Sequence, residues 1–169
     1  YGDDVVTDQA RSWVREHFGA GAEFFPVFNG TGANVVALQS VNHRWQSVIC
    51  SASAHIHVDE GGAPESMAGM KLWTVPTADG KLRPDDVQGQ CFDMEFVHRA
   101  QPGAVSITQS SEMGTVYSPD EVSALAEVAH ANNLALHMDG ARLSNAAASL
   151  HLPVRAFTVD AGVDLVSFG

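Results

Sequence analysis

Apolar and polar residues follow two patterns along this chain. Short apolar runs predict strands, and apolar residues that recur every three or four positions predict helices. The runs predict strands over residues 23–28, 47–52, 70–75, 104–109, 134–138 and 165–168. The periodic stretches and their boundary residues predict helices over residues 4–18, 33–42, 84–88, 118–132 and 141–150. Residues 55–62 lack either pattern and predict a polar loop or a strand extension.

Several helix boundaries are marked by residue type. Ser118 stands before Pro119 and two acidic residues, which is the preferred order at the start of a helix. Asp3 or Asp4 can cap the first helix in the same way. That helix carries an apolar stripe made of Val6, Ala10, Trp13, Val14 and Phe18.

The alternation of strands and helices determines the expected fold class. Successive strands joined by helices form right-handed crossovers and a mainly parallel sheet. We therefore expect an α/β fold with three αβα layers. No internal repeat or low-complexity linker divides the 169 residues, so one domain is the economical interpretation.

Composition restricts the partners. Apolar residues make up 45% of the chain and charged residues 17%, which is ordinary for a globular protein. The net charge of −11 argues against nucleic acid or an anionic membrane as a partner, since both require a basic surface. The only cysteines, Cys50 and Cys91, form no metal or disulfide motif, and reduced thiols favour a cytoplasmic protein.

The ends of the chain are unusual. It begins on Tyr1-Gly2 without an initiating methionine and stops directly after a predicted strand. We therefore expect an excerpt from a longer protein, covering part of a larger domain.

An acid and a base follow the strand at 134–138. Asp139-Gly140 favours a hairpin turn, but a helix follows here, which weakens that interpretation. Arg142 stands in the first turn of this helix, where the helix dipole prefers acids. A cation tolerated there indicates an anionic partner, such as a carboxylate. Ligands of open α/β sheets bind beyond the carboxyl edge of the strands, where both residues are expected.

Three other segments could carry chemistry. The turn Asn29-Gly30-Thr31-Gly32 begins a helix, so it is either a simple capped turn or a phosphate site. His55 and His57 would share a face of a strand, which leaves open a metal site, a surface pair or stacking on a flat cofactor. Glu112 follows a strand and could act as an acid or base near Asp139, or be a solvated loop residue.

In this order, the motifs resemble a known family. The sequence is similar to the low-specificity threonine aldolases, within the fold-type-I pyridoxal-phosphate enzymes of the aspartate aminotransferase-like superfamily. The resemblance covers the whole chain, about half of a typical member. Its motifs are Tyr1-Gly2-Asp3-Asp4, Asn29-Gly30-Thr31-Gly32-Ala33-Asn34, His55 with Glu60-Gly61-Gly62, Glu112-Met113-Gly114-Thr115-Val116, His137-Met138-Asp139-Gly140-Ala141-Arg142-Leu143, and Asp164-Leu165-Val166-Ser167-Phe168.

The resemblance implies a pyridoxal 5′-phosphate site. It implies that Gly30 and Thr31, with the amide of Gly32, hold the cofactor phosphate. His55 would stack on the pyridine ring, and Asp139 would pair with the ring nitrogen. Arg142 would clamp the substrate carboxylate, and no metal is implied.

The implied activity is a retro-aldol cleavage. Threonine, allo-threonine or a related β-hydroxy-α-amino acid would give glycine and an aldehyde. Many members carry a histidine where this chain has Glu112, a position linked in the family to handling the β-hydroxyl. The base is therefore Glu112, His55 or a water. The lysine that attaches the cofactor would lie a few residues past Gly169, and Lys71 and Lys81 are poor substitutes.

Other functions stay open. A β-eliminating lyase of the same superfamily would have a similar cofactor site. A catalytically silent binding or assembly fragment is another class, and a metal protein that uses His55, His57 and Asp59 is a third. The resemblance also implies a homodimer or homotetramer.

Overall fold

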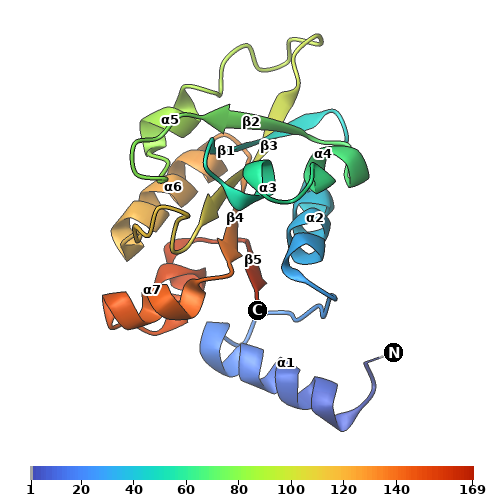
Figure 1. The fold of residues 1–169 in the computed structure, drawn as a ribbon, viewed down its shortest axis with the longest axis vertical. Coiled ribbons are helices and arrows are strands. Elements are labelled where there is room, and N and C mark those ends of the chain that lie inside the picture. Colours follow the sequence, from blue (N-terminus) through green and yellow to red (C-terminus); the bar gives the residue numbers. More distant parts are fainter. Residues whose placement is uncertain (1) are drawn as a thin grey trace.

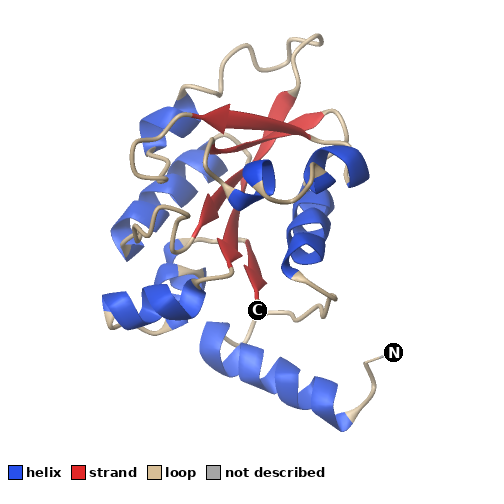
Figure 2. Ribbon diagram, in the orientation of Figure 1, coloured by secondary structure: helices blue, strands red, loops and turns tan. Residues whose placement is uncertain are grey.

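Five parallel strands form a single sheet in the order β2-β1-β3-β4-β5 (Figures 1 and 2). The structure, a computed structural model, describes residues 2–169. Its strands are β1 (Gln46–Ser51), β2 (Lys71–Val75), β3 (Gln101–Thr108), β4 (Ala135–Gly140) and β5 (Leu165–Phe168). The predicted parallel α/β sheet is confirmed.

Helices connect the strands and cover the sheet. They are α1 (Val5–Phe18), α2 (Gly30–Val41), α3 (His55–Val58), α4 (Ala63–Met67), α5 (Pro84–Gln88), α6 (Pro119–Ala131) and α7 (Leu143–Leu150), with the short 3₁₀ helices η1 (Val154–Phe157) and η2 (Val159–Ala161). Within the described residues, no helix is long and apolar enough to cross a bilayer.

Each face of the sheet has its own core. Alternate side chains of a strand point to opposite faces, so Leu136 and Met138 pack with α6 and α7, whereas Ala135 packs toward α2. The larger core lies on the α6 face and includes the fully buried side chains of Leu125 and Phe157. The smaller core lies beneath α2, α3 and α4 and is made of Leu38, Val48, Cys50, Ala54, Ile56, Ala68, Met70 and Ala104. The three-layer prediction is therefore confirmed.

The helix caps agree with their sequence signals. The Ser118 hydroxyl accepts a hydrogen bond from the Glu121 amide, and the Glu121 carboxylate accepts one from the Ser118 amide. This reciprocal pair satisfies two amides that α6 leaves free. Asp4 caps α1 through the amides of Val6 and Thr7.

Two expectations about the first half of the chain are wrong, those for residues 23–28 and for residues 55–58. Residues 23–28 form no strand, because Pro26 interrupts the run and lacks a donor for a ladder. Phe25 and Phe28 of this segment are 80% and 90% exposed. The apolar stripe of α1 is also largely exposed, and only Phe18 is buried. Residues 55–58 form helix α3 instead of a loop or strand.

Two helix starts also differ from the expectation. Helix α2 begins at Gly30, so the Gly30-Thr31-Gly32 turn is its first turn. Helix α7 begins at Leu143, which makes Arg142 its N-cap residue rather than a member of the first turn. Gly140 is the last residue of β4, and a Cβ there would lie 2.8 Å from the Ser167 carbonyl oxygen. Only glycine therefore allows β4 and β5 to pair this closely.

Candidate active site at the carboxyl edge of the sheet

Asp139 lies in the buried end of β4, on the face covered by α2. Asp139 is 5% exposed. Oδ1 accepts a hydrogen bond from the Ala141 amide at 3.0 Å, and Oδ2 accepts one from Asn34 Nδ2 at 3.1 Å. These two hydrogen bonds fix the orientation of the Asp139 carboxylate.

Asn34 links Asp139 to a second buried acid. The same Nδ2 donates to Glu60 Oε1 at 2.7 Å, although α2 and Glu60 are separated by β1 and α3 along the chain. The Asn34 and Glu60 residues are 2% and 7% exposed. One amide group thus fixes the spacing of two carboxylates.

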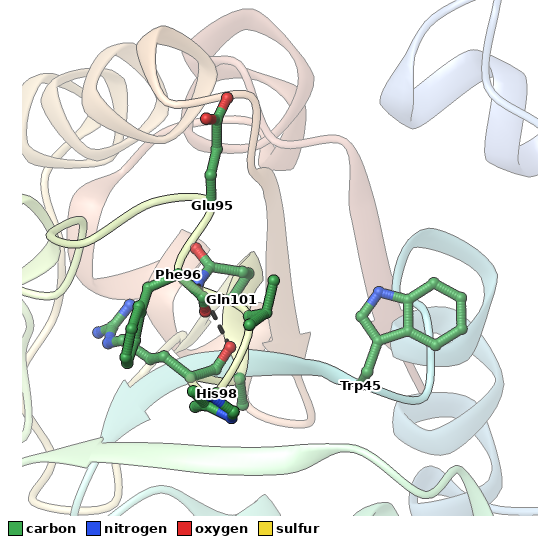
Figure 3. A pocket seen from close by; sticks show the side chains of 8 residues that line it. Trp45, Glu95, Phe96, His98 and Gln101 are labelled. Atoms are coloured by element: carbon green, nitrogen blue, oxygen red, sulfur yellow. Dashed lines mark hydrogen bonds between the residues drawn. The ribbon is translucent and has the colours of Figure 1, made fainter.

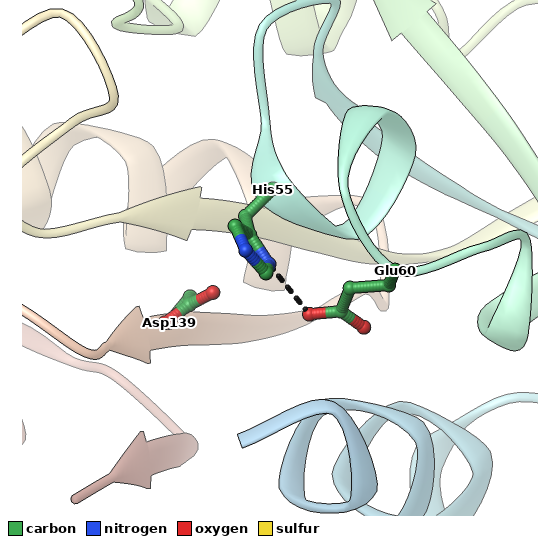
Figure 4. Close-up of side chains that lie close together, drawn as sticks. All are labelled: His55, Glu60 and Asp139. Carbon is green, nitrogen blue, oxygen red and sulfur yellow. Dashed lines mark hydrogen bonds and ion pairs between the residues drawn. The ribbon is translucent and has the colours of Figure 1, made fainter.

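His55 is joined to this pair through its ring. Its Nδ1 lies 3.0 Å from Glu60 Oε1 (Figure 4). The hydrogen bond to Glu60 raises the pKa of His55; burial lowers that pKa, and the negative charges of Glu60 and Asp139 add to the rise. The His55 side chain is 41% exposed, whereas the Glu60 side chain is fully buried. The imidazole of His55 is therefore partly accessible to solvent, while the carboxylate that holds it is buried.

Arg142 lies between the ends of β3 and β4. Its Nε donates to the Ser110 carbonyl oxygen at 2.9 Å, and its Nη2 donates to Glu112 Oε1 at 2.9 Å. The Arg142 side chain is 35% exposed. The guanidinium is thus anchored on one edge and reachable from solvent.

The first turn of α2 provides backbone amides for an anion. Asn29 Oδ1 accepts from the Gly32 amide at 2.7 Å, so this amide is engaged by the cap and is poorly placed to hold a phosphate as the resemblance implied. Gly30 and Thr31 are the first two residues of the helix, where amides have no partner within the helix. A Cβ at Gly30 would meet no atom within 4 Å, so the space beside it is open.

A buried histidine, His137, lies two residues before Asp139 on the same strand. His137 Nδ1 is 2.9 Å from Ser106 Oγ, and its Nε2 is 2.9 Å from Ser167 Oγ. Burial lowers the pKa of His137 to about 4, against the opposing effect of the Asp139 charge. A neutral imidazole has one donor and one acceptor nitrogen, so one serine donates to the ring and the other accepts from it.

Within residues 2–169, five buried side-chain acceptors have no hydrogen-bond partner, and three of them lie at this edge of the sheet. These three are Asn34 Oδ1, Glu60 Oε2 and Glu112 Oε2. Leaving a buried acceptor unpaired costs about 1–3 kcal/mol. Their concentration around Asp139 and Arg142 is therefore typical of a site that receives donor groups from a ligand.

The metal interpretation based on His55, His57 and Asp59 is not supported by the geometry. On a helix, residues two apart point to different sides, and His57 and Asp59 are exposed. The ligand atoms that do converge belong to His55, Glu60 and Asp139, all within 4.8 Å of one another. The hydrogen bonds from Asn34 and His55 already occupy Glu60 Oε1 in this group.

The structure brings most, but not all, of the predicted site residues into one hydrogen-bonded network. The structure connects His55, Asp139, Arg142 and Glu112 through hydrogen bonds, directly or through Asn34 and Glu60. Gly30 and Thr31 stand one helical turn before Asn34, on the same helix. Asn34 and Glu60 received no role from sequence reasoning. A carboxamide inside the apolar helix at 33–42 was the available signal for Asn34.

A hollow of about 580 Å³ lies at the opposite edge of the sheet (Figure 3). It is lined by residues 95–101 together with Trp45, at the amino ends of β3 and β1. Its cation, Arg99, is packed against two aromatic rings. The Arg99 Cζ atom lies 4.1 Å from the ring centroid of Trp73 and 3.9 Å from that of Phe92. The carboxyl edge, with the buried carboxylates of Glu60 and Asp139, is the better candidate for chemistry.

An all-parallel αβα sheet with its polar cluster beyond the carboxyl edge defines a ligand-binding α/β domain. Comparison with known sequences makes the class specific. The beta-eliminating lyase family model matches residues 1–169, and the chain belongs to that family.

Several of the similar proteins are named threonine aldolases. The chain is 43% identical over 170 aligned residues to the low specificity L-threonine aldolase of Pseudomonas sp. strain NCIMB 10558, covering 100% of this chain and 49% of that protein. It is 27% identical to the Escherichia coli K12 enzyme of the same name, over 94% of this chain and 47% of that protein. The chain thus spans about half the length of the curated relatives that it matches.

Solved structures agree with this fold. Threonine aldolase from Leishmania major superposes with a TM-score of 0.92 at 29% identity, covering 100% of this chain and 49% of that one. A C-S lyase from Staphylococcus hominis, described as PLP-bound, has a TM-score of 0.54 at 14% identity, over 78% of this chain and 34% of that one. The second likeness shows the fold alone.

Proposed function

We propose that this chain is part of a pyridoxal-phosphate-dependent threonine aldolase. The observation that carries the proposal is the buried Asp139 carboxylate, oriented by Asn34 at the sheet edge and followed three residues later by Arg142. The family membership and the named relatives support the same assignment.

The donor set fits the cofactor. Asp139 would face the ring nitrogen, and His55 would stack on the ring from the side of Glu60. Gly30 and Thr31 would bind the phosphate, because a helix start combines free amides with the positive end of the dipole. At a net charge of −11, local amides rather than a general positive field must perform this task.

When bound, pyridoxal phosphate withdraws electrons from the α-carbon of an attached amino acid. Asp139 would lie beside the ring nitrogen and favour its protonated form. Arg142 binds the substrate carboxylate, a task that suits its planar fork of donors. Arg142 would thus orient the substrate, and Asp139 would polarise the cofactor ring.

The β-hydroxyl proton needs an acceptor. His55 uses Nδ1 toward Glu60, and within residues 2–169 its Nε2 has no partner. Above its raised pKa, neutral His55 can therefore accept this proton at Nε2. Loss of this proton would allow the Cα–Cβ bond to break and release an aldehyde, with a proton returned to Cα to give glycine.

Product analysis of the full-length protein tests the proposal. Incubated with pyridoxal phosphate and threonine or allo-threonine, it should form glycine and acetaldehyde in equal amounts. Pyruvate and ammonia from serine, without glycine from threonine, would instead identify a β-eliminating lyase. No product from either substrate would indicate a silent binding or assembly protein, and elemental analysis that finds stoichiometric metal would revive the metal reading.

We also propose a homodimer or homotetramer located in the cytoplasm. Large apolar side chains exposed on α1 and before α2, such as Val6, Phe25 and Phe28, support a subunit interface. The free thiols of Cys50 and Cys91 support a reducing compartment. Light scattering of the full-length protein tests the assembly, and fluorescence microscopy of a tagged chain tests the location.

A further inference from the structure

Glu112 holds two separate parts of the site with one oxygen atom. Its Oε1 accepts from Arg142 Nη2 at 2.9 Å and from the His55 backbone amide at 3.2 Å. Arg142 follows β4, His55 begins α3, and Glu112 lies in the loop after β3. The Glu112 side chain is only 17% exposed, so this bridge is partly shielded from water.

The bridge also determines which edge of Arg142 is open. The guanidinium can present either its Nε and Nη2 edge or its Nη1 and Nη2 edge to a carboxylate. Ser110 O occupies Nε and Glu112 Oε1 occupies a proton of Nη2, so the first edge is taken. Among the described residues Nη1 has no partner, which leaves the second edge for a ligand.

We propose that Glu112 is a positioning residue that makes the Nη1–Nη2 edge of Arg142 the receptor for the substrate carboxylate. This inference rests on the proposed function only in taking the ligand to be an amino acid. Glu112 thereby sets the position of the carboxylate relative to His55, since the same oxygen binds the His55 amide.

This role differs from that of a proton acceptor. A base would take its proton on Oε2, which has no partner among the described residues, and it requires the negative charge of the carboxylate. The bridge requires only that Oε1 accept from Arg142 and from the His55 amide. The two roles therefore predict different effects for the removal of charge and for the removal of the whole group.

Two substitutions separate these roles in the cofactor-loaded full-length protein. Glu112→Gln keeps an oxygen that can accept from Arg142 and from the His55 amide, whereas Glu112→Ala removes it. Calorimetric titration should show glycine binding about 10- to 100-fold weaker in Glu112→Ala, the effect of losing one charge-assisted hydrogen bond. Glu112→Gln should stay within about threefold of the wild type, because its oxygen preserves the bridge.

Ethanolamine, which lacks the carboxylate, provides the matched ligand control. Its affinity should be the same in all variants, since it does not use Arg142. Glu127→Gln, an exposed carboxamide substitution on α6, is the matched protein control. If melting shows that Glu112→Ala does not fold, Glu112→Ser replaces it, because serine is too short to reach Arg142.

The kinetics of threonine cleavage supply the second readout. Positioning predicts a raised KM in Glu112→Ala, with kcat of Glu112→Gln within tenfold of the wild type. A loss of kcat by about 10²–10⁴ in Glu112→Gln, with unchanged glycine binding, would identify Glu112 as the base and overturn the proposal. Unchanged glycine binding in Glu112→Ala would also overturn it. If threonine is not cleaved at all, the aldolase assignment fails, while the glycine titration still reports on the Arg142 edge.

Discussion

The two faces of the sheet are built from the same strands but bury different groups. On the α6 face, Leu136 and Met138 join a continuous apolar core. On the α2 face, the alternate residues His137 and Asp139 of the same strand are buried with polar partners. Since a buried polar group must be paired to avoid a desolvation cost, the second face is the more exacting to build. The difference indicates that one face stabilises the domain and the other carries its chemistry.

The largest expected effect is the loss of Asp139 from the polar face. Asp139→Ala should lower threonine cleavage by at least about 10³-fold, because preorganised charge at a reacting group contributes several kcal/mol to catalysis. Some cofactor binding should remain. Steady-state kinetics of the full-length variant measures the effect, with the exposed Asp120→Asn as a control. Near-normal turnover in Asp139→Ala would refute the role of this carboxylate.

The apolar face should respond in the opposite way. Leu125→Ala removes a fully buried side chain of the larger core and should lower the free energy of unfolding by about 2–5 kcal/mol. The KM for threonine should be unchanged in the folded fraction, since Leu125 is remote from Asp139. Denaturant unfolding measures the loss. Leu152→Ala, at a residue that is 37% exposed, should cost much less.

Acidification should destabilise the polar face through His137. Its pKa is about 4 in the folded protein, below the ordinary value of 6.5, so protons bind the unfolded chain first as the pH falls. The contribution of this group to the free energy of unfolding is unchanged above pH 6.5 and falls progressively as the pH drops toward 4. His137→Gln removes this titration and should flatten the curve over that range. Parallel curves for the two proteins would contradict the assignment.

The smallest effect concerns the pKa of His55. Glu60 raises this pKa through a hydrogen bond, so Glu60→Gln should lower it. The raised value also means that Glu60 stabilises the fold at low pH and that this contribution disappears as the pH rises through the pKa of folded His55. Titration of the His55 ring by NMR measures the change, with the exposed Glu65→Gln as a control. An unchanged pKa in Glu60→Gln would show that another group causes the shift.

Local signals in the sequence predicted most of the framework. Apolar runs located β1 and β4 to within one or two residues at each end, and the capping signature at Ser118 located the start of α6. The prediction for residues 23–28 was wrong because the apolar pattern outweighed Pro26, which cannot donate to a strand ladder. The α3 turn failed because His55 and its neighbours carry no helical periodicity over so short a length.

The site was less predictable than the fold. The edge position of Asp139 followed from its place after an apolar run, and the roles of His55 and Arg142 came from the family resemblance. The hydrogen bonds of Asn34 to Asp139 and Glu60 join residues 105 and 26 positions apart. Such pairings depend on the way α2 docks on the sheet, which no local pattern contains.

The position of Asn34 on α2 fixes its distance from the start of the helix. Thr31 and Asn34 are three residues apart, which corresponds to about 4.5 Å along a helix axis. The helix therefore fixes the distance between the amides that we propose bind the phosphate and the carboxamide that holds Asp139. One residue inserted between them would turn the Asn34 side chain by about 100° about the axis. The spacing of Thr31 and Asn34 in α2 thus determines how long a ligand must be to reach from the first amides of the helix to Asp139.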